Sequence, residues 1–352
     1  MTFALILWLS AAVAPPENPA LNVDFLALND EMIAFLDHHV GDINDEAQRL
    51  NTLVHVIFSE KLLDLEYDNS RTRTAAETFD SRSGNCISFT AMFVAMARHL
   101  ELNARFQEVV NFPTWDKNKG VVVLNMHMNA AVTIKGRPYV MDFNPYAARK
   151  QRKSKIVGDD RARGHYLNNL GAEHIARRDY PGALPFFEKA VAMAPDLSFA
   201  WSNLGVAYSK NGREEDAEAA YLHAIELNRS EFTAMSNLTK LYTRQNKTEA
   251  AERYASRVDS FRRKNPYYHY YLGEQAYNQG DYKASIKHFK SAIRRKDHEH
   301  EFYFALAKTY SQMDDHKRVE KSLRKARKYA PDVFDQNRYS QKLEMLPEAR
   351  NQ

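Results

Sequence analysis

The stretch SRSGNCISFTAMFVAMARHLELNARF, residues 81–106, decides how the first half of the chain is interpreted. From Cys86 to Leu100 almost every side chain is apolar, and a helix of that composition has to be buried on most of its sides. A polar stretch at residues 68–85 comes before it. Strand-like segments follow it at residues 104–111, 121–135 and 137–143. The order predicts a central buried helix that begins at Cys86 and is followed by β-strands.

Two more helices are expected upstream of this stretch, at residues 29–40 and 44–60. Each begins with an asparagine, which is a good N-cap residue, and each carries apolar residues at helical spacing. Together with the buried helix and the strands, they predict a domain of helices and strands over residues 23–146.

Cys86 is the only cysteine among the 352 residues, and it is expected at a helix N-terminus. The unpaired N–H groups and partial positive charge of a helix N-terminus both favour a thiolate. A reactive thiolate also needs an imidazole to accept and donate the proton, and a third group to orient that imidazole. His127, in LNMHMNAAV, and Asp142, in RPYVMDFNP, lie in neighbouring strand-like segments. A turn at Lys135-Gly136 would join these segments into a hairpin and bring the two side chains together.

At these residues the chain resembles the transglutaminase-like superfamily over roughly residues 45–146. In that family a Gly-x-Cys opens the helix, which ends in an arginine and a turn that leads to a strand. Gly84, Cys86 and Arg98 match this motif. The family's histidine heads a strand pair, and its aspartate ends the next strand before a proline, as His127, Asp142 and Pro145 do here. The aromatic residue common after the family's histidine is replaced by Met128 and Asn129.

The resemblance implies an α+β papain-like or transglutaminase-like domain with a catalytic triad. Cys86 would be the nucleophile, His127 the general base and acid, and Asp142 the residue that orients the imidazole. The family's chemistry is acyl transfer through a thioester, either to water, as in a protease or amidase, or to an amine. Taken singly, each residue also has a structural explanation: a small buried cysteine, a core histidine and a turn-forming aspartate.

The second half of the chain repeats every 34 residues. Leucines recur at this spacing, each followed by a residue that is usually small, and further rows of small and bulky residues keep the same register. The leucines are Leu170, Leu204, Leu238, Leu272 and Leu306, and the next residues are Gly171, Gly205, Thr239, Gly273 and Ala307. The bulky row is Phe187, Tyr221, Ala255, Phe289 and Leu323.

This period resembles the tetratricopeptide repeat, in which each repeat is a pair of antiparallel helices. The small residues let the paired helices approach closely, and no repeat buries its apolar face without a neighbour. Residues 164–333 therefore predict five stacked repeats, an all-α solenoid, and residues 334–352 a capping helix and tail.

Stacked repeats leave a concave groove, and three asparagines recur just before the leucine row. Related repeat proteins use such an asparagine ladder to bind the backbone of an extended peptide. Asn169, Asn203 and Asn237 would form it here. The alternative is that asparagine is simply common at this repeat position. The expected partner of the repeats is a protein or peptide.

The composition limits the other functions. The formal net charge is only +4, so charge alone gives no case for nucleic acid as a partner. A single cysteine cannot form an internal disulfide. No phosphate-binding glycine loop is present, and His298 and His300 lie in a turn among acidic residues, so neither a cofactor nor a metal site is expected.

Residues 1–22 are expected to be a signal or membrane-targeting segment. Residues 3–14 are nearly all apolar and end in a small-x-small sequence before Pro15-Pro16, as in an exported protein. No Lys or Arg precedes Arg49, and the run is too short to span a bilayer, so the alternative is a helix packed on the following domain. Membrane association through this segment is a further expectation. Residues 147–163, rich in Lys and Arg, are expected to be a linker.

Two functions from different classes fit these patterns. The first is a cysteine acyl hydrolase or acyltransferase whose repeats recruit a protein substrate, in the periplasm or cell envelope. The second is a catalytically inactive protein-binding scaffold of the bacterial cell envelope. A third, a cytoplasmic adaptor, applies if residues 3–14 are not a signal. The presence of all three triad residues favours the enzyme.

Overall fold

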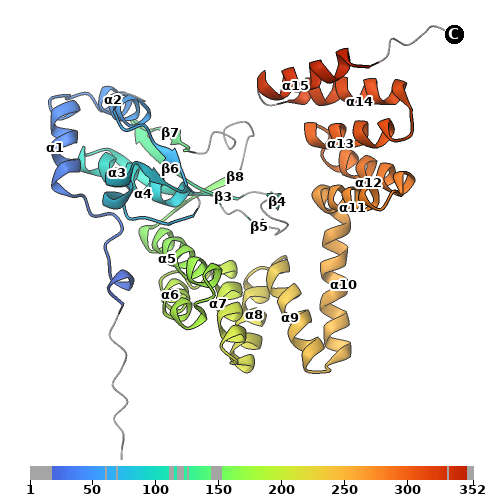
Figure 1. Cartoon of the computed structure of the whole chain (residues 1–352). Helices are drawn as coiled ribbons and strands as arrows, with labels where there is room; N and C mark the ends of the chain where they lie inside the picture. The colour runs from blue at the N-terminus through green and yellow to red at the C-terminus, as the bar shows by residue number, and fades with distance from the viewer. Residues whose placement is uncertain are drawn as a thin grey trace, which may run out of the picture. The chain divides into compact units, whose positions relative to one another are not determined.

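A computed structural model describes residues 18–59, 62–68, 70–110, 115–116, 123–124, 127–143, 153–330 and 333–346. The chain divides into two compact units, Met1–Ala234 and Met235–Gln352. Figure 1 shows the elements of both. The expected signal at residues 3–14 and Pro145 lie outside the described residues. Within the described residues, no helix is long and apolar enough to cross a membrane.

The first unit begins with a short 3₁₀ helix, η1 (Pro19–Leu21), and four α-helices. They are α1 (Asp30–His39), α2 (Glu46–Phe58), α3 (Ala75–Ser81) and α4 (Cys86–His99). Asn29 caps α1, as expected, because its side chain accepts a hydrogen bond from the N–H of Met32. The cap of α2 is Asp45 rather than Asn44, which moves the start of that helix by one residue. Helix α3 lies in the stretch interpreted as merely polar, and Thr74 starts it with a capping box.

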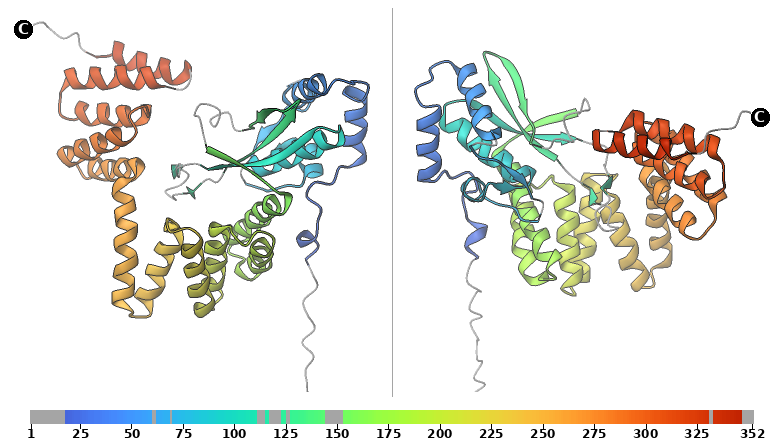
Figure 2. Two further views of the ribbon diagram at one scale, coloured as in Figure 1. Left: turned by 180° about the vertical axis from the view of Figure 1, so that it is seen from behind. Right: turned by 45° about the horizontal axis from the view of Figure 1, so that its top comes forward.

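The main sheet of this unit is antiparallel, with strand order β7-β6-β3-β8. Its strands are β3 (Asn103–Val110), β6 (His127–Ile134), β7 (Arg137–Met141) and β8 (Lys153–Val157). Two short pairs accompany it: β1 (Glu66–Tyr67) with β2 (Ser83–Gly84), and β4 (Trp115–Asp116) with β5 (Val123–Leu124). Figure 2 shows the sheet from two further directions.

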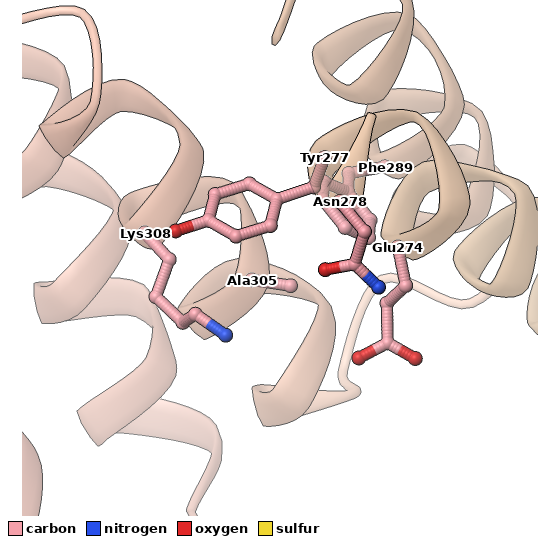
Figure 3. A pocket seen from close by; sticks show the side chains of 6 residues that line it. All are labelled: Glu274, Tyr277, Asn278, Phe289, Ala305 and Lys308. Atoms are coloured by element: carbon pink, nitrogen blue, oxygen red, sulfur yellow. The ribbon is translucent and has the colours of Figure 1, made fainter. Parts of the chain in front are cut away.

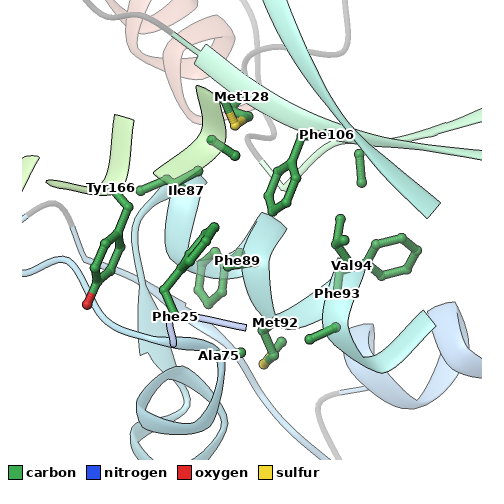
Figure 4. Packing of buried hydrophobic residues seen from close by; sticks show 14 of the residues in the cluster. Phe25, Ala75, Ile87, Phe89, Met92, Phe93, Val94, Phe106, Met128 and Tyr166 are labelled. Atoms are coloured by element: carbon green, nitrogen blue, oxygen red, sulfur yellow. The ribbon is translucent and has the colours of Figure 1, made fainter. Parts of the chain in front are cut away.

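Helix α4 packs against β3 and β6 and forms the centre of the core. All its residues from Ile87 to Ala97 are buried, as the apolar sequence predicted. Aromatic side chains from other segments complete this core, among them Phe25 and Phe106 (Figure 4). The Thr90 hydroxyl lies 2.6 Å from the carbonyl oxygen of Cys86 and 3.2 Å from that of Met128, so it joins α4 to β6.

The expected linker at residues 147–163 is corrected by strand β8. Lys153–Val157 pairs with β3, with Val157 opposite Phe106 and Lys153 opposite Val110. Its lysines suggested a solvated linker, but lysine is also typical of edge strands, where it discourages pairing with other chains. Helix α5 then begins at Asp159, so the expected boundary at residue 164 falls inside a helix.

Ten repeat helices and a final helix follow in the described residues. The first unit holds α5 (Asp159–Ala176), α6 (Tyr180–Met193), α7 (Ser198–Lys210) and α8 (Glu214–Leu227). Then come α9 (Phe232–Arg244), α10 (Thr248–Lys264), α11 (Pro266–Asn278), α12 (Tyr282–Arg295), α13 (His300–Ser311) and α14 (His316–Tyr329). The final helix, α15 (Val333–Glu344), packs on α14 and buries Tyr339 completely.

In three of the repeats, a glycine of the small row meets an aromatic residue of the bulky row. A Cβ atom added to Gly171 would lie 2.7 Å from the Phe187 ring, and one added to Gly205 would lie 2.6 Å from the Tyr221 ring. Gly273 is equally close, at 2.6 Å, to Phe289. These glycines are therefore required by the contact between the paired helices, since the aromatic ring occupies the space of a side chain.

Candidate active site

Cys86 is the first residue of α4, at the helix end where the sequence analysis expected it. The residue before it, Asn85, caps the helix: its Oδ1 accepts hydrogen bonds from the N–H of Ser88 at 3.1 Å and from the Ser88 hydroxyl at 3.0 Å. Asn85 is buried, whereas Cys86 is only half-buried. The thiol therefore lies at a capped, electropositive helix end that solvent still reaches.

His127 and Asp142 are brought together by the β6–β7 hairpin. Its turn holds Lys135 at φ 48° and Gly136 at φ 78°, and the register pairs Ile134 with Arg137. His127 begins β6 and Asp142 follows the last residue of β7. The Nε2 atom of His127 lies 2.7 Å from Oδ1 of Asp142.

The electrostatics of this pair favour a protonated imidazole. Burial of His127 is the largest single effect and opposes protonation, whereas the hydrogen bond with Asp142 favours it. A further hydrogen bond with Cys86 acts in the same direction, and together they raise the pKa of His127 to about 9. All three residues selected from the sequence therefore adjoin one another where β6 begins and β7 ends.

Two neighbouring residues were missed by the sequence analysis. Asn129 donates a hydrogen bond from Nδ2 to Oδ2 of Asp142 at 3.1 Å, so the two oxygens of that carboxylate bind different partners. Tyr67, in β1, interacts with the Cys86 thiol, and the pKa of the Tyr67 phenol is raised, first by burial and then by Cys86. The signal for Asn129 was its position two residues after His127, because side chains two residues apart in a strand lie on the same face.

The three asparagines of the expected ladder lie at equivalent positions of successive helix pairs. Asn169 is in α5, Asn203 in α7 and Asn237 in α9, and all three are half-buried. Asn203 donates from Nδ2 to Oδ1 of Asn168 at 2.9 Å, a contact between adjacent pairs that the sequence did not suggest. Asn237 belongs to the second unit, so the ladder stays a prediction.

The second unit contains a small pocket of its own between α11, α12 and α13. Its volume is about 140 Å³, and both charged and aromatic side chains line it (Figure 3). The lining residues are Glu274, Tyr277, Asn278, Phe289, Ala305 and Lys308. Among the described residues, no group of three or more His, Cys, Asp or Glu side chains is arranged to hold a metal ion.

Comparisons with known proteins describe both parts of the chain. The model of the transglutaminase-like superfamily matches residues 34–143. Models of the tetratricopeptide repeat match residues 164–194, 198–231, 239–301 and 300–333.

One curated relative is the photosystem I assembly protein Ycf3 of Rippkaea orientalis, strain PCC 8801, which is 33% identical over 79 residues. The match covers 20% of this chain, and the chain spans about half the length of that protein, 46%.

Solved structures resemble about half of the chain at low similarity. The MamA protein of Desulfovibrio magneticus RS-1 is 16% identical with a TM-score of 0.28, over 49% of this chain and 96% of its own. YrrB, described as a repeat protein with an unusual peptide-binding site, is 15% identical with a TM-score of 0.27, over 50% of this chain and 91% of its own. From the matching family models, the chain is a fusion of a transglutaminase-like domain with tetratricopeptide repeats, and so an enzyme-like or binding module.

Proposed function

We propose that the chain is a cysteine acyl hydrolase or acyltransferase that acts on an amide bond of a protein or peptide held by the repeats. The observation that carries this proposal is the contact of His127 with both Asp142, at 2.7 Å, and the thiol at the start of α4. A thiol, an imidazole and an orienting carboxylate in this order are the parts of an activated nucleophile.

The reaction would begin from the pair in which the Cys86 proton has passed to the His127 ring nitrogen that Asp142 does not bind. The thiolate then attacks the carbonyl carbon of the substrate amide, and the carbonyl oxygen takes the negative charge. N–H groups in the first turn of α4 stabilise this oxyanion. When the C–N bond breaks, the imidazolium gives its proton to the leaving amine, and a thioester remains on Cys86. Water or a second amine, deprotonated by His127, attacks the thioester and releases the thiol.

The repeats would supply the protein-binding part of this function. Repeats of this kind support protein–protein interaction, and the pocket between α11 and α13 offers a peptide both a carboxylate, Glu274, and an ammonium group, Lys308. A site with both charges fits a polar peptide segment rather than an apolar one.

The test is the alkylation of Cys86 by iodoacetamide. We define the alkylation ratio as the rate at pH 6 divided by the rate at pH 9. An ordinary thiol gives a ratio on the order of 0.01, because few of its molecules are thiolates at pH 6. We expect a ratio above about 0.1 in the wild type, and a decrease of at least about tenfold in His127→Ala, since the thiolate loses its imidazolium partner. His99→Ala, at the other end of the same helix, is the matched control.

A wild-type ratio near that of an ordinary thiol, or one unchanged by His127→Ala, would contradict the catalytic proposal. The protein would then be the inactive binding scaffold. Export, expected from residues 3–14, is a separate proposal: the mass of the mature chain from its native cell would show whether that segment has been removed.

A further inference from the structure

Helix α5 belongs to the repeats by its sequence period, yet it also holds the segment that leads to Cys86. Oε1 of Glu173, near the end of α5, accepts a hydrogen bond from the N–H of Thr72 at 2.5 Å. The Glu173 side chain is only 16% exposed, so this carboxylate is largely shielded from competing water. Residues 101 positions apart in the chain are thus joined by one charge-assisted hydrogen bond.

From Thr72 the hydrogen bonds continue to the cap of α4. Oγ1 of Thr72 accepts from Nδ2 of Asn85 at 2.9 Å, and both residues are buried. Asn85 caps α4 directly before Cys86. We call Glu173, Thr72 and Asn85 the Glu173 hydrogen-bond chain. The N–H of Arg73 also binds the Ser88 hydroxyl, at 2.9 Å, so the same segment fixes the first turn of α4.

The opposite ends of the same two helices are joined as well. Asp159, the first residue of α5, accepts two hydrogen bonds from Arg98 in the last turn of α4, at 2.7 and 2.8 Å. Arg98 also donates from Nε to the carbonyl oxygen of Ala104, at the start of β3. Helix α5 therefore fixes the Cys86 helix at both of its ends.

A third contact reaches the strand beside His127. Glu108 in β3 is 3% exposed, and α5 supplies both of its partners. Arg161 donates to it at 2.9 Å from Nε and 3.2 Å from Nη2, and Nε2 of His165 lies 3.0 Å away. The next residue of β3, Val109, pairs with His127 in the sheet. Helix α5 thus contacts α4, which carries Cys86, and β3, the strand that pairs with the His127 strand.

We propose that α5 is a positioning element of the candidate active site, and that Glu173 acts on Cys86 through the Glu173 hydrogen-bond chain. This inference rests on the proposed function, because it assigns the repeats a role in arranging the nucleophile. Without Glu173, the Thr72 N–H loses its half-buried acceptor, and Thr72 is no longer fixed as the partner of Asn85. The first turn of α4 and the Cys86 thiol then no longer hold one position relative to His127.

The experiment measures the alkylation ratio of Cys86 in the full chain. We expect Glu173→Ala to lower it at least threefold, while the thermal midpoint shifts by only a few degrees. Glu173→Gln retains an oxygen that accepts from Thr72, so it should recover at least half of the wild-type ratio. Thr72→Val, which breaks the chain at its second residue, should lower the ratio as Glu173→Ala does. The matched control is Asp160→Asn, because Asp160 is an exposed carboxylate on the same helix; this substitution should leave the ratio unchanged.

The outcomes separate this inference from the proposed function. If His127→Ala lowers the ratio but Glu173→Ala and Thr72→Val leave it within twofold of the wild type, the catalytic pair exists and the positioning role of α5 is wrong. If His127→Ala has no effect but Glu173→Ala does, the catalytic proposal fails while α5 still positions the thiol. The inference is also contradicted if Glu173→Ala lowers the alkylation ratio and Glu173→Gln lowers it equally. The decrease would then be a general effect of replacing Glu173 and would not depend on the hydrogen bond to Thr72.

Discussion

Asp142 divides its two carboxylate oxygens between two side chains, His127 at 2.7 Å and Asn129 at 3.1 Å. The amide of Asn129 is 4% exposed, and its own Oδ1 has no hydrogen-bond partner among the described residues. Buried polar groups are usually hydrogen-bonded, so an unpaired amide oxygen is unusual. Here the amide is oriented by its donation to the carboxylate, and this contact stabilises one orientation of that carboxylate. Asn129 therefore fixes the rotamer in which Asp142 faces the imidazole.

Replacing Asn129 tests this at the scale of one hydrogen bond. A hydrogen bond to a charged group contributes about 1.5 kcal/mol, so Asn129→Ala should lower the rate of Cys86 alkylation at pH 6 by about tenfold. Thr133→Ala, at an exposed position on the same strand and the same face, is the control. Equal rates for Asn129→Ala and the wild type would show that Asp142 keeps its orientation unaided.

The buried Glu108 carboxylate predicts sensitivity to acid. Burial alone would raise the pKa of Glu108, but hydrogen bonds from His165 and Arg161 outweigh it and lower the pKa from 4.5 to about 2. Because the folded-state pKa lies below the unfolded one, the stabilisation is complete above about pH 4.5 and disappears as the pH falls to about 2. A shift of this size corresponds to about 3 kcal/mol.

Urea unfolding of the wild type and Glu108→Gln at pH 7 and pH 3 measures this contribution. We expect the variant to be less stable by about 3 kcal/mol at pH 7, because Arg161 is left without its buried partner. At pH 3 the difference should be smaller, since protonation removes part of the wild type's advantage. The same difference at both pH values would mean that the Glu108 carboxylate is not the titrating group.

At the scale of the elements, three of the repeats match a glycine in the first helix to an aromatic residue in the second. Gly171 faces Phe187, Gly205 faces Tyr221 and Gly273 faces Phe289. The third repeat has Thr239 and Ala255 in these rows instead, so the larger residue has moved to the first helix. This exchange of sizes follows from the close packing of protein interiors, where one added methyl group has to displace a neighbour.

The pairing can be tested with Gly205→Ala. The added Cβ would lie 2.6 Å from the Tyr221 ring, so we expect a loss of about 1–3 kcal/mol in the free energy of unfolding. Tyr221→Leu should make the same Gly205→Ala change less costly, giving a favourable coupling of about 1 kcal/mol in a double-mutant cycle measured by urea unfolding. Additive effects of the two substitutions would show that the helices do not meet at these residues.

At the scale of the whole molecule, the first unit includes both the transglutaminase-like domain and the first two helix pairs. The core explains this grouping: Phe25 stacks on Phe106 of β3 and on Tyr166 of α5, with ring centroids 6.0 and 5.2 Å apart. Together with the two partners of Glu108, these contacts make α5 a part of the domain core. The division of this chain by sequence family therefore differs from its division by packing.

Truncation distinguishes the two divisions. We expect residues 1–234 to unfold cooperatively, as followed by circular dichroism, and to keep the alkylation ratio of the full chain. Residues 1–158 would leave Glu108 buried without Arg161 and His165, and would expose Phe25, so this fragment should show no cooperative transition. A cooperative transition at the same temperature for both fragments would show that the transglutaminase-like domain folds without the repeats.

The sequence by itself determined the features that depend on local pattern. The 34-residue period predicted the helix pairs, because each repeat places the same side-chain sizes at the same contacts. The apolar run after Cys86 predicted the buried helix, and the Lys135-Gly136 turn predicted the hairpin that joins His127 to Asp142. Each of these features depends on a local or regularly repeating pattern, so it can be identified along the sequence.

Only the tertiary structure decided the features whose causes lie far apart in the chain. Strand β8 forms because β3, more than 40 residues earlier, offers an unpaired edge, and no property of its lysines required that. The register of the hairpin places Asn129 beside Asp142. Folding brings Glu173 to the N–H of Thr72, for which it is the hydrogen-bond acceptor. A hydrogen bond between residues distant in sequence leaves no periodic trace, because it needs only one donor and one acceptor brought together by folding.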